Sequence, residues 1–128
     1  MNLLLDTHVL LWWLTDDPKL SRTARDALLN EEHAVWVSAA SAWELSTKAR
    51  LGKLDQAKAI LQSFDATVNE EGFQHLPITC QHALHAGALE SNHRDPFDRM
   101  LASQAALEGH TLVTSDAAFR EFTIKLSW

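Results

Sequence analysis

The sequence predicts an α/β fold: a three-layer α/β/α sandwich with a central parallel sheet of four to five strands. Short segments that are apolar throughout, such as 2–5 and 34–38, are predicted as strands. Strands of this kind are buried on both faces, whereas a strand with one solvated face alternates apolar and polar residues. Segments with helical spacing separate them, and this alternation is typical of a parallel sheet covered by helices on both sides.

In the N-terminal half, helices are expected to begin at residues able to cap them and to end at glycine. Thr7 and Ser21 carry hydroxyls that accept a hydrogen bond from an N–H in the first helical turn. Gly52 and Gly72 follow helical patterns, and glycine commonly ends a helix. The elements expected here are a strand at 2–5, helices at 8–14 and from 21, a strand at 34–38, and helices from 39 to 51 and from 55 to about 68.

The C-terminal half contains the clearest helix start. In DPFDRMLASQAALEG, Asp95 occupies the N-cap, Pro96 the first helical position, and Gly109 the position just after the end. No internal repeat or linker interrupts the chain, so we expect a single domain over 1–128. The other elements expected are a strand at 73–77, a helix at 80–89, a strand at 111–115, a helical turn at 116–121 and a last short strand at 122–128.

The composition restricts the class of protein. The chain has 128 residues, of which 46% are hydrophobic and 22% charged, which is ordinary for a globular domain. Its one cysteine, Cys80, cannot form an intrachain disulfide, and no segment is long enough to span a bilayer, so we expect a cytoplasmic protein without membrane contact. The net charge of −6 argues against a broad basic face for nucleic acid, but not against acids gathered around metal ions.

Four acidic residues occupy comparable places in the predicted elements. Asp6 and Asp116 follow predicted strands, Glu44 lies in the helix after the second strand, and Asp98 lies in the first turn of a later helix. Ligands bind outside the carboxyl ends of parallel strands, so we expect all four acids at one edge of the sheet. Clustered carboxylates repel one another unless a divalent cation compensates, and Mg²⁺ or Mn²⁺ prefers such oxygen ligands.

Each acid also has a structural explanation that the sequence leaves open. Asp95 is placed as a helix cap and is left outside the metal set. If the acids only cap helices, the chain is a non-catalytic RNA- or protein-binding module. An aspartyl phosphotransferase using Asp6 is a weaker alternative, because the DxDxT signature is missing. The structural alternatives are a turn or cap for Asp6 and Asp116, a solvated ion pair with Lys48 for Glu44, and a capping box for Asp98.

Four segments, in order and over essentially the whole chain, carry a family resemblance: LLLDTHVLLWWL, SAASAWELSTKARLGKL, HRDPFDRMLASQA and LVTSDAAF. They resemble the PIN-domain ribonucleases, specifically the VapC-like toxins of bacterial type II toxin–antitoxin pairs. The resemblance implies a PIN-like fold and an endoribonuclease that hydrolyses RNA through metal-activated water, with Mg²⁺ or Mn²⁺ held by Asp6, Glu44, Asp98 and Asp116. It also implies a cognate antitoxin and a homodimer.

Polar residues near these acids are candidates for contact with RNA. Basic side chains would bind phosphates, and such binding is salt-sensitive. Hydroxyl groups near the strand ends would orient water or phosphate. Trp12 and Trp13 are adjacent on a helix and cannot point the same way, so one is expected on a dimer or antitoxin surface. The residues expected to bind substrate are Thr7, Ser38, Lys48, Arg50, Arg94, Arg99 and Thr114.

Overall fold

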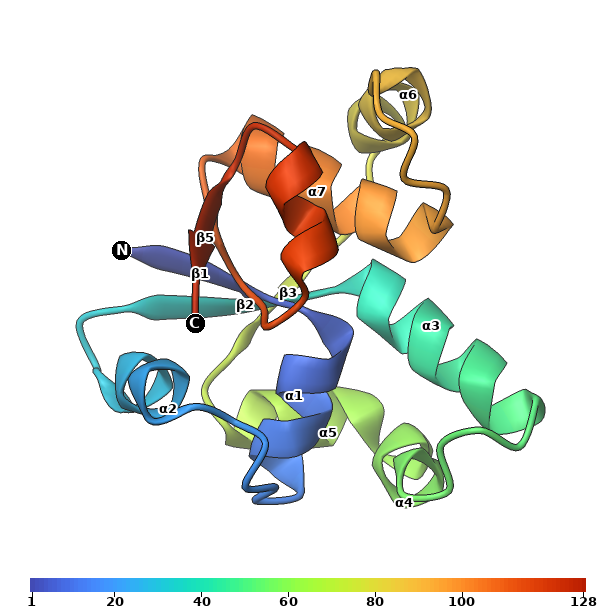
Figure 1. Ribbon diagram of the computed structural model, residues 1–128. Helices are drawn as coiled ribbons and strands as arrows, with labels where there is room; N and C mark the ends of the chain where they lie inside the picture. The colour runs from blue at the N-terminus through green and yellow to red at the C-terminus, as the bar shows by residue number, and fades with distance from the viewer.

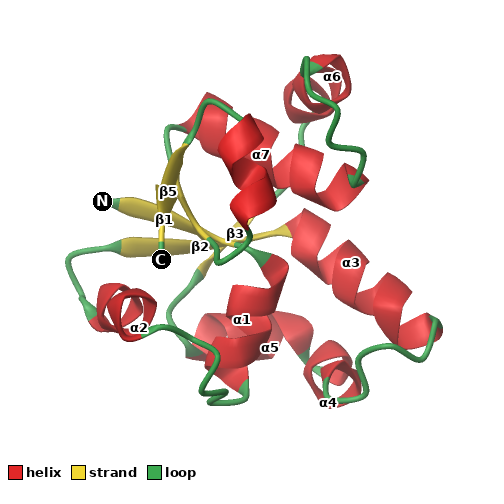
Figure 2. Ribbon diagram, in the orientation of Figure 1, coloured by secondary structure: helices red, strands yellow, loops and turns green.

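The computed structural model describes residues 1–128 and contains one five-stranded sheet (Figures 1 and 2). The strand order is β3-β2-β1-β4-β5, and every neighbouring pair is parallel. The prediction of a parallel α/β sheet is therefore confirmed. The strands are β1 (Asn2–Leu5), β2 (Ala34–Ser38), β3 (Gln74–Leu76), β4 (Thr111–Val113) and β5 (Lys125–Ser127).

Helices connect the strands. None of them combines the length and the apolar character needed to cross a lipid bilayer. Figure 2 shows that most of the chain outside the sheet is helical. The helices are α1 (Thr7–Leu14), α2 (Arg22–Leu29), α3 (Ala39–Arg50), α4 (Ala57–Gln62), α5 (Phe64–Glu70), α6 (Cys80–Ala88), α7 (Pro96–Glu108) and the 3₁₀ helix η1 (Ala117–Glu121).

The leucines of β1 show why the central strands are apolar throughout. Leu3 and Leu5 point to the face covered by α1, α2, α4 and α5, while Leu4 points to the face covered by α7 and η1. All three are fully buried, because helices cover both faces of the sheet. Figure 1 shows α7 above the sheet and α1, α2 and α5 below it, which confirms the three layers.

Two predictions about local structure are wrong. The N-cap of α1 is Asp6 rather than Thr7; Thr7 is the first helical residue, and its buried Oγ1 shares a hydrogen bond of 2.9 Å with Ser41 Oγ. The single helix predicted over about 55–68 is two short helices, because Ser63 leaves the helical region at φ −140°. The serine side chain competes for the hydrogen bonds of the helical backbone, so a helix break at this residue costs little free energy.

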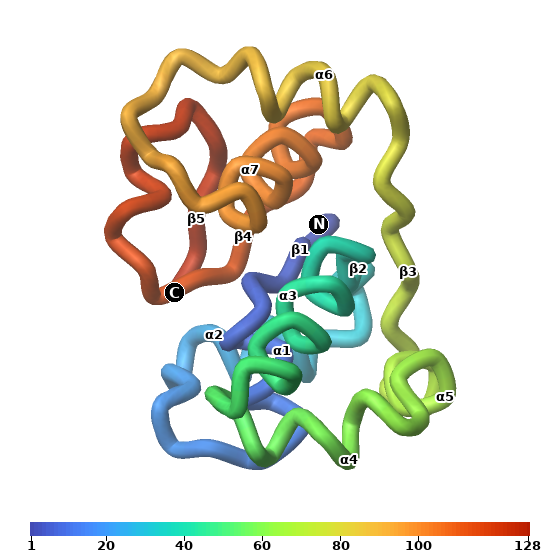
Figure 3. The backbone as a smooth tube through the Cα atoms, turned by 90° about the vertical axis from the view of Figure 1, so that its right-hand side faces the viewer, coloured from blue at the N-terminus to red at the C-terminus, as the bar shows by residue number.

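The start of α7 agrees with the prediction. Asp95 Oδ1 accepts hydrogen bonds from the N–H groups of Phe97 and Asp98, and Gly109 ends the helix at φ +69°. Because β4 begins soon after this helix ends, α7 runs antiparallel to β4. The first turn of α7 therefore lies at the carboxyl edge of the sheet, the edge that faces the viewer in Figure 3.

The strand order marks one place at this edge. The chain passes from β1 to β2 and β3 on one side, and later to β4 and β5 on the other side of β1. The order reverses between β1 and β4, and ligands of open parallel sheets bind outside the carboxyl ends of the strands at such a point.

Candidate metal-binding active site

An acidic cavity of about 370 Å³ lies at the carboxyl edge of the sheet. The segments that meet here are far apart in the sequence: the ends of β1 and β4, the middle of α3 and the start of α7. Among its lining residues are all four acids that the sequence analysis selected as metal ligands. The cavity is lined by Asp6, Glu44, Asp98 and Asp116, together with His8, Trp12, Lys48, Asp95 and Ser115.

Asp6 is held against β4. Its N–H donates to the Val113 carbonyl at 3.0 Å, and the Thr114 hydroxyl donates to Asp6 Oδ2 at 2.7 Å. The side chain makes no capping hydrogen bond with α1, although Asp6 is the N-cap by position. Burial raises the pKa of Asp6; the Thr114 bond opposes this shift and the charge of Glu44 adds to it. The structure therefore uses Asp6 as a buried carboxylate rather than as a cap.

Glu44 forms the expected pair with Lys48, but not on the surface. The Lys48 ammonium donates to Glu44 Oε2 at 2.5 Å, one helical turn away. Glu44 is only 3% exposed, so the alternative explanation of a solvated ion pair does not describe it. Its other oxygen, Oε1, is buried and has no hydrogen-bond partner. A buried carboxylate oxygen without a partner costs free energy, which a cation would recover.

Asp98 is the third residue of α7, and its carboxylate faces a histidine. His93 Nε2 donates to Asp98 Oδ2 at 2.8 Å. The capping box considered for Asp98 is absent, because Oδ2 bonds His93 rather than the backbone of Asp95. Burial raises the pKa of Asp98 to about 6, the charges of Asp95 and Asp6 add to the shift, and the His93 bond opposes it.

His93 is a site residue that the sequence reasoning missed. It belongs to the quoted segment HRDPFDRMLASQA and lies five residues before Asp98. This spacing indicates a possible contact, because a side chain just before a helix, such as that of His93, can reach a residue in the first turn, such as Asp98. From the sequence alone, only the acids and arginines of this segment were expected to take part in the chemistry.

Asp116 and Asp95 cap helices and line the cavity at the same time. Asp116 is exposed, and its Oδ1 accepts from the N–H of Ala118 at the start of η1. Asp95 uses Oδ1 alone to cap α7. In both residues the cap occupies one carboxylate oxygen, so capping and ligand binding are compatible explanations.

The donor set fits a hard divalent cation, although it does not form a closed cage. Carboxylate oxygens are the ligands that Mg²⁺ and Mn²⁺ prefer, and the unpartnered Glu44 Oε1 offers one such oxygen. No three His, Cys, Asp or Glu side chains in the structure are arranged to hold one metal ion together. Each central acid is instead held by a protein donor; these donors are Thr114 for Asp6, Lys48 for Glu44 and His93 for Asp98.

Three residues expected to bind substrate have internal roles instead. Ser38 is fully buried, where it caps α3 and donates to Gln104 Oε1 at 2.5 Å. Thr7 is buried against Ser41, as described above. The Arg99 guanidinium donates to the backbone carbonyls of Ala86, Gly87, Leu89, Ser91 and His93. The sequence cannot separate such an arginine from one that binds phosphate, because both need the same donors.

The remaining four residues of that set are placed as follows. Lys48 lines the acidic cavity. Thr114 does not line it, but its hydroxyl donates to Asp6, which does. Arg50 is exposed at the end of α3. Arg94 is exposed and lines a neighbouring polar cavity of about 410 Å³ beside His93. These positions leave Arg50 and Arg94 exposed to a phosphate, while the Lys48 ammonium is paired with Glu44 at the cavity wall.

Three of the tryptophans have different surroundings: the acidic cavity, the hydrophobic core and the surface. Trp12 lines the acidic cavity, with its ring centroid 6.0 Å from that of His8. Trp13 packs on Phe73. Trp43 on α3, which the sequence analysis did not single out, is 55% exposed.

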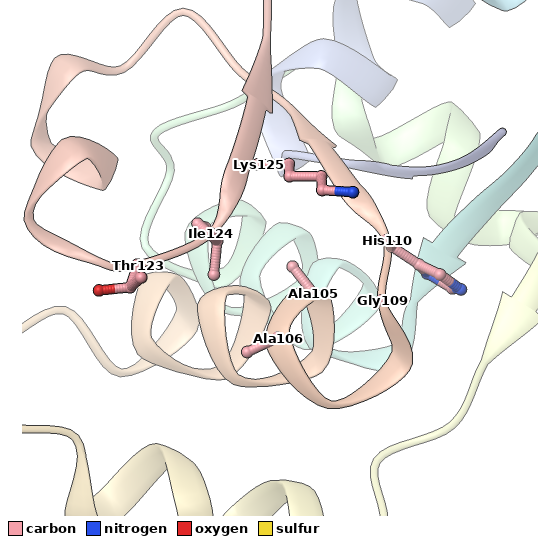
Figure 4. A pocket seen from close by; sticks show the side chains of 7 residues that line it. All are labelled: Ala105, Ala106, Gly109, His110, Thr123, Ile124 and Lys125. Atoms are coloured by element: carbon pink, nitrogen blue, oxygen red, sulfur yellow. The ribbon is translucent and has the colours of Figure 1, made fainter.

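A second cavity, of about 400 Å³, lies at the opposite edge of the sheet (Figure 4). Its residues come from the end of α7 and the starts of β4 and β5, and none is acidic. Figure 4 shows the His110 side chain pointing away from the small residues of α7; its ring packs 5.2 Å from the Trp36 ring, and burial lowers the pKa of His110. This cavity offers no carboxylate to hold a metal ion.

Comparison with known proteins agrees with this arrangement. Residues 3–125 match the PIN domain family. Ribonuclease VapC22 of Mycobacterium tuberculosis is 34% identical over 122 residues, which cover 93% of this chain and 90% of that protein. The resemblance inferred from the sequence is therefore confirmed.

Solved structures support the fold. A chain of VapBC2 from Rickettsia felis, bound to a DNA fragment from its promoter, has a TM-score of 0.71 at 18% identity and covers 99% of this chain and 98% of its own. A chain of FitAcB from Neisseria gonorrhoeae has a TM-score of 0.69 at 20% identity, covering 97% and 95%. With the family match over nearly its whole length and this sheet topology, the chain belongs to the PIN domain family.

Proposed function

We propose that this protein is a divalent-metal-dependent endoribonuclease whose active site is the acidic cavity. The observation that carries the proposal is the buried, unpartnered Glu44 Oε1 in a cavity that gathers acids from four separate segments. The name and the 34% identity of the ribonuclease from Mycobacterium tuberculosis support RNA as the substrate.

The proposed ligands are Asp6, Glu44, Asp98 and Asp116, and the proposed ion is Mg²⁺ or Mn²⁺. A divalent cation at such a site supplies charge that activates water for attack on the phosphodiester bond and stabilises the leaving oxygen. The protein orients the ligands: Thr114 holds Asp6 and His93 holds Asp98. Because water is the proposed nucleophile, we expect products with 5′-phosphate ends.

Basic side chains near the cavity would contact the RNA backbone. Lys48 lies inside the cavity, while Arg50 and Arg94 are exposed outside it. The whole chain has a net charge of −6, so attraction to RNA would depend on these few basic side chains. Because contacts between basic side chains and phosphates are screened by salt, we expect RNA binding to weaken steeply as salt concentration rises.

The non-catalytic alternative receives less support. It requires the acids to act as helix caps, but Asp6 and Asp98 make no capping bond through their side chains, and Glu44 lies inside a helix. The aspartyl phosphotransferase alternative relies on Asp6 alone and gives no role to Glu44, Asp98 and Asp116, which line the same cavity.

We also propose that the protein is the toxin of a toxin–antitoxin pair and forms a homodimer. Solved structures with this fold include VapBC complexes from Rickettsia felis and nontypeable Haemophilus influenzae. An aromatic pair near the cavity offers a partner surface: Trp43 on α3 is exposed, and its ring centroid lies 4.6 Å from that of the partly buried Phe97 on α7. The proposed location of the protein is the cytoplasm. A free cysteine, Cys80, is compatible with that reducing compartment.

The proposed activity is tested with purified protein and mixed RNA, incubated with Mg²⁺, with Mn²⁺ and with a chelator. We expect cleavage with either ion and none with the chelator. Asp6→Asn and Asp98→Asn should abolish cleavage, whereas Asp26→Asn, an exposed aspartate on α2, should leave it unchanged. Cleavage that survives chelation, or that survives both cavity substitutions, contradicts the proposal.

A further inference from the structure

We propose that His93 is a positioning residue: it fixes the Asp98 carboxylate so that one oxygen faces the acidic cavity as a metal ligand. This inference rests on the proposed function of the cavity. It assigns a role to a side chain outside the four proposed ligands.

The hydrogen bond between the two side chains has a defined direction. An ionised carboxylate only accepts hydrogen bonds, so the 2.8 Å contact places a proton on His93 Nε2. The bond occupies Oδ2 of Asp98, and Oδ1 forms no hydrogen bond within the protein. The side chains are 18% and 13% exposed, so water competes little for this contact.

The imidazole ring is held in place by aromatic neighbours. Its centroid lies 5.6 Å from that of Phe122 in an edge-on arrangement at 89°, and 6.3 Å from that of Phe119. Both phenylalanines are buried in the core between α7 and the sheet. These two rings therefore restrict the turning of the imidazole on the side that faces the core.

The backbone that carries the ring is held as well. His93 donates its N–H to Ser91 Oγ at 3.1 Å, and its carbonyl accepts from Arg99 Nη1 at 2.9 Å. Ser91 Oγ in turn donates to Glu121 Oε2 at 3.0 Å, which ties the segment to η1. Arg99 directly follows Asp98 in α7. The same helical turn therefore carries Asp98 and the arginine that holds the backbone of His93.

The hydrogen bond from His93 to Asp98 is not needed to hold the local fold. The first turn of α7 is already capped by Asp95, so the helix does not need His93. Arg99 and Ser91 hold the segment through its backbone, so the segment does not need the imidazole N–H. What the imidazole adds is a fixed orientation of one carboxylate. Side chains that orient metal-binding residues in this way affect metal affinity by about 10- to 100-fold.

The test measures the affinity of the protein for Mn²⁺, from the electron paramagnetic resonance signal of the unbound ion. Wild type is compared with His93→Gln, whose side-chain amide keeps a donor, and with His93→Met, which has similar length and no donor. We expect His93→Met to weaken Mn²⁺ binding by about 10- to 100-fold and His93→Gln to restore most of the affinity.

Two further variants control for structural effects. His93→Phe keeps an aromatic ring among Phe119 and Phe122 without a donor, so it serves if the methionine variant does not fold. His85→Phe breaks a comparable bond, from His85 Nδ1 to Ser103 Oγ, outside the cavity, and should leave Mn²⁺ affinity unchanged.

The outcomes separate this inference from the proposed function. Wild-type affinity in a folded donorless variant overturns the role of His93 but leaves the metal site intact. Equal weakening in the glutamine and methionine variants also overturns it, because a donor then makes no difference. A wild-type protein that binds no Mn²⁺ overturns the metal-dependent function and this inference together.

Discussion

The carboxylates of the acidic cavity differ in what surrounds each of them. Asp6 and Glu44 are buried, Asp98 is half-buried and Asp116 is exposed. Burial raises the pKa of Asp6 and of Asp98, because it disfavours their charged forms. The metal-free protein is therefore destabilised at neutral pH by charges that a bound cation would stabilise.

This property predicts how the stability of the metal-free protein depends on pH. Asp98 has a pKa of about 6 in the folded protein against 3.8 when unfolded. The unfolded state loses its proton first as pH rises, so the folded state loses stability between about pH 4 and pH 6. We expect Asp98→Asn to reduce this loss and Asp116→Asn to leave it unchanged. Urea unfolding in chelator across this range measures it, and identical pH profiles for wild type and Asp98→Asn contradict it.

The pair of Glu44 and Lys48 gives a second prediction for single residues. Lys48→Met would leave the Glu44 carboxylate buried without its counter-charge. Since Lys48 is 27% exposed, we expect a loss of about 2 kcal/mol, below the range for fully buried pairs. Adding Glu44→Gln should recover most of this loss. A double-mutant cycle by urea unfolding measures the coupling, and additive effects contradict it.

Among the elements, α7 shows what local sequence predicts well. Its start was predicted because Asp95 and Pro96 act within one turn, and its end because Gly109 takes positive φ. The break between α4 and α5 was not predicted, since Ser63 is a weak local signal. The bond from His93 to Asp98 was missed for another reason: it depends on how a loop and a helix pack.

Substitution of Asp95 distinguishes its role as the N-cap of α7 from a role as a metal ligand in the acidic cavity. Asp95→Ala removes the cap and should cost about 1 kcal/mol, while Asp95→Asn keeps an oxygen that can accept the same bonds. If Asp95 only caps α7, Asp95→Asn should match wild type in both thermal stability and RNA cleavage. Normal stability with abolished cleavage in Asp95→Asn would instead make Asp95 a ligand.

For the whole molecule, the topology of the sheet explains why the acids meet. The sequence predicted a parallel sheet from its apolar strands, and from it one common edge for the acids. It could not supply the strand order, which places β4 beside β1 and so Thr114 against Asp6. Nor could it show that Arg99 binds backbone carbonyls, because the residue type serves phosphate equally well.

The central claim is that this edge of the sheet holds divalent metal for RNA hydrolysis. The most direct test is a crystal structure of the protein with Mn²⁺, using anomalous scattering from manganese to locate the ion. We predict an anomalous peak in the cavity lined by Asp6, Glu44, Asp98 and Asp116, absent from crystals of Asp6→Asn grown in the same way. An empty cavity in Mn²⁺-saturated crystals, or a peak only elsewhere on the protein, would contradict the claim.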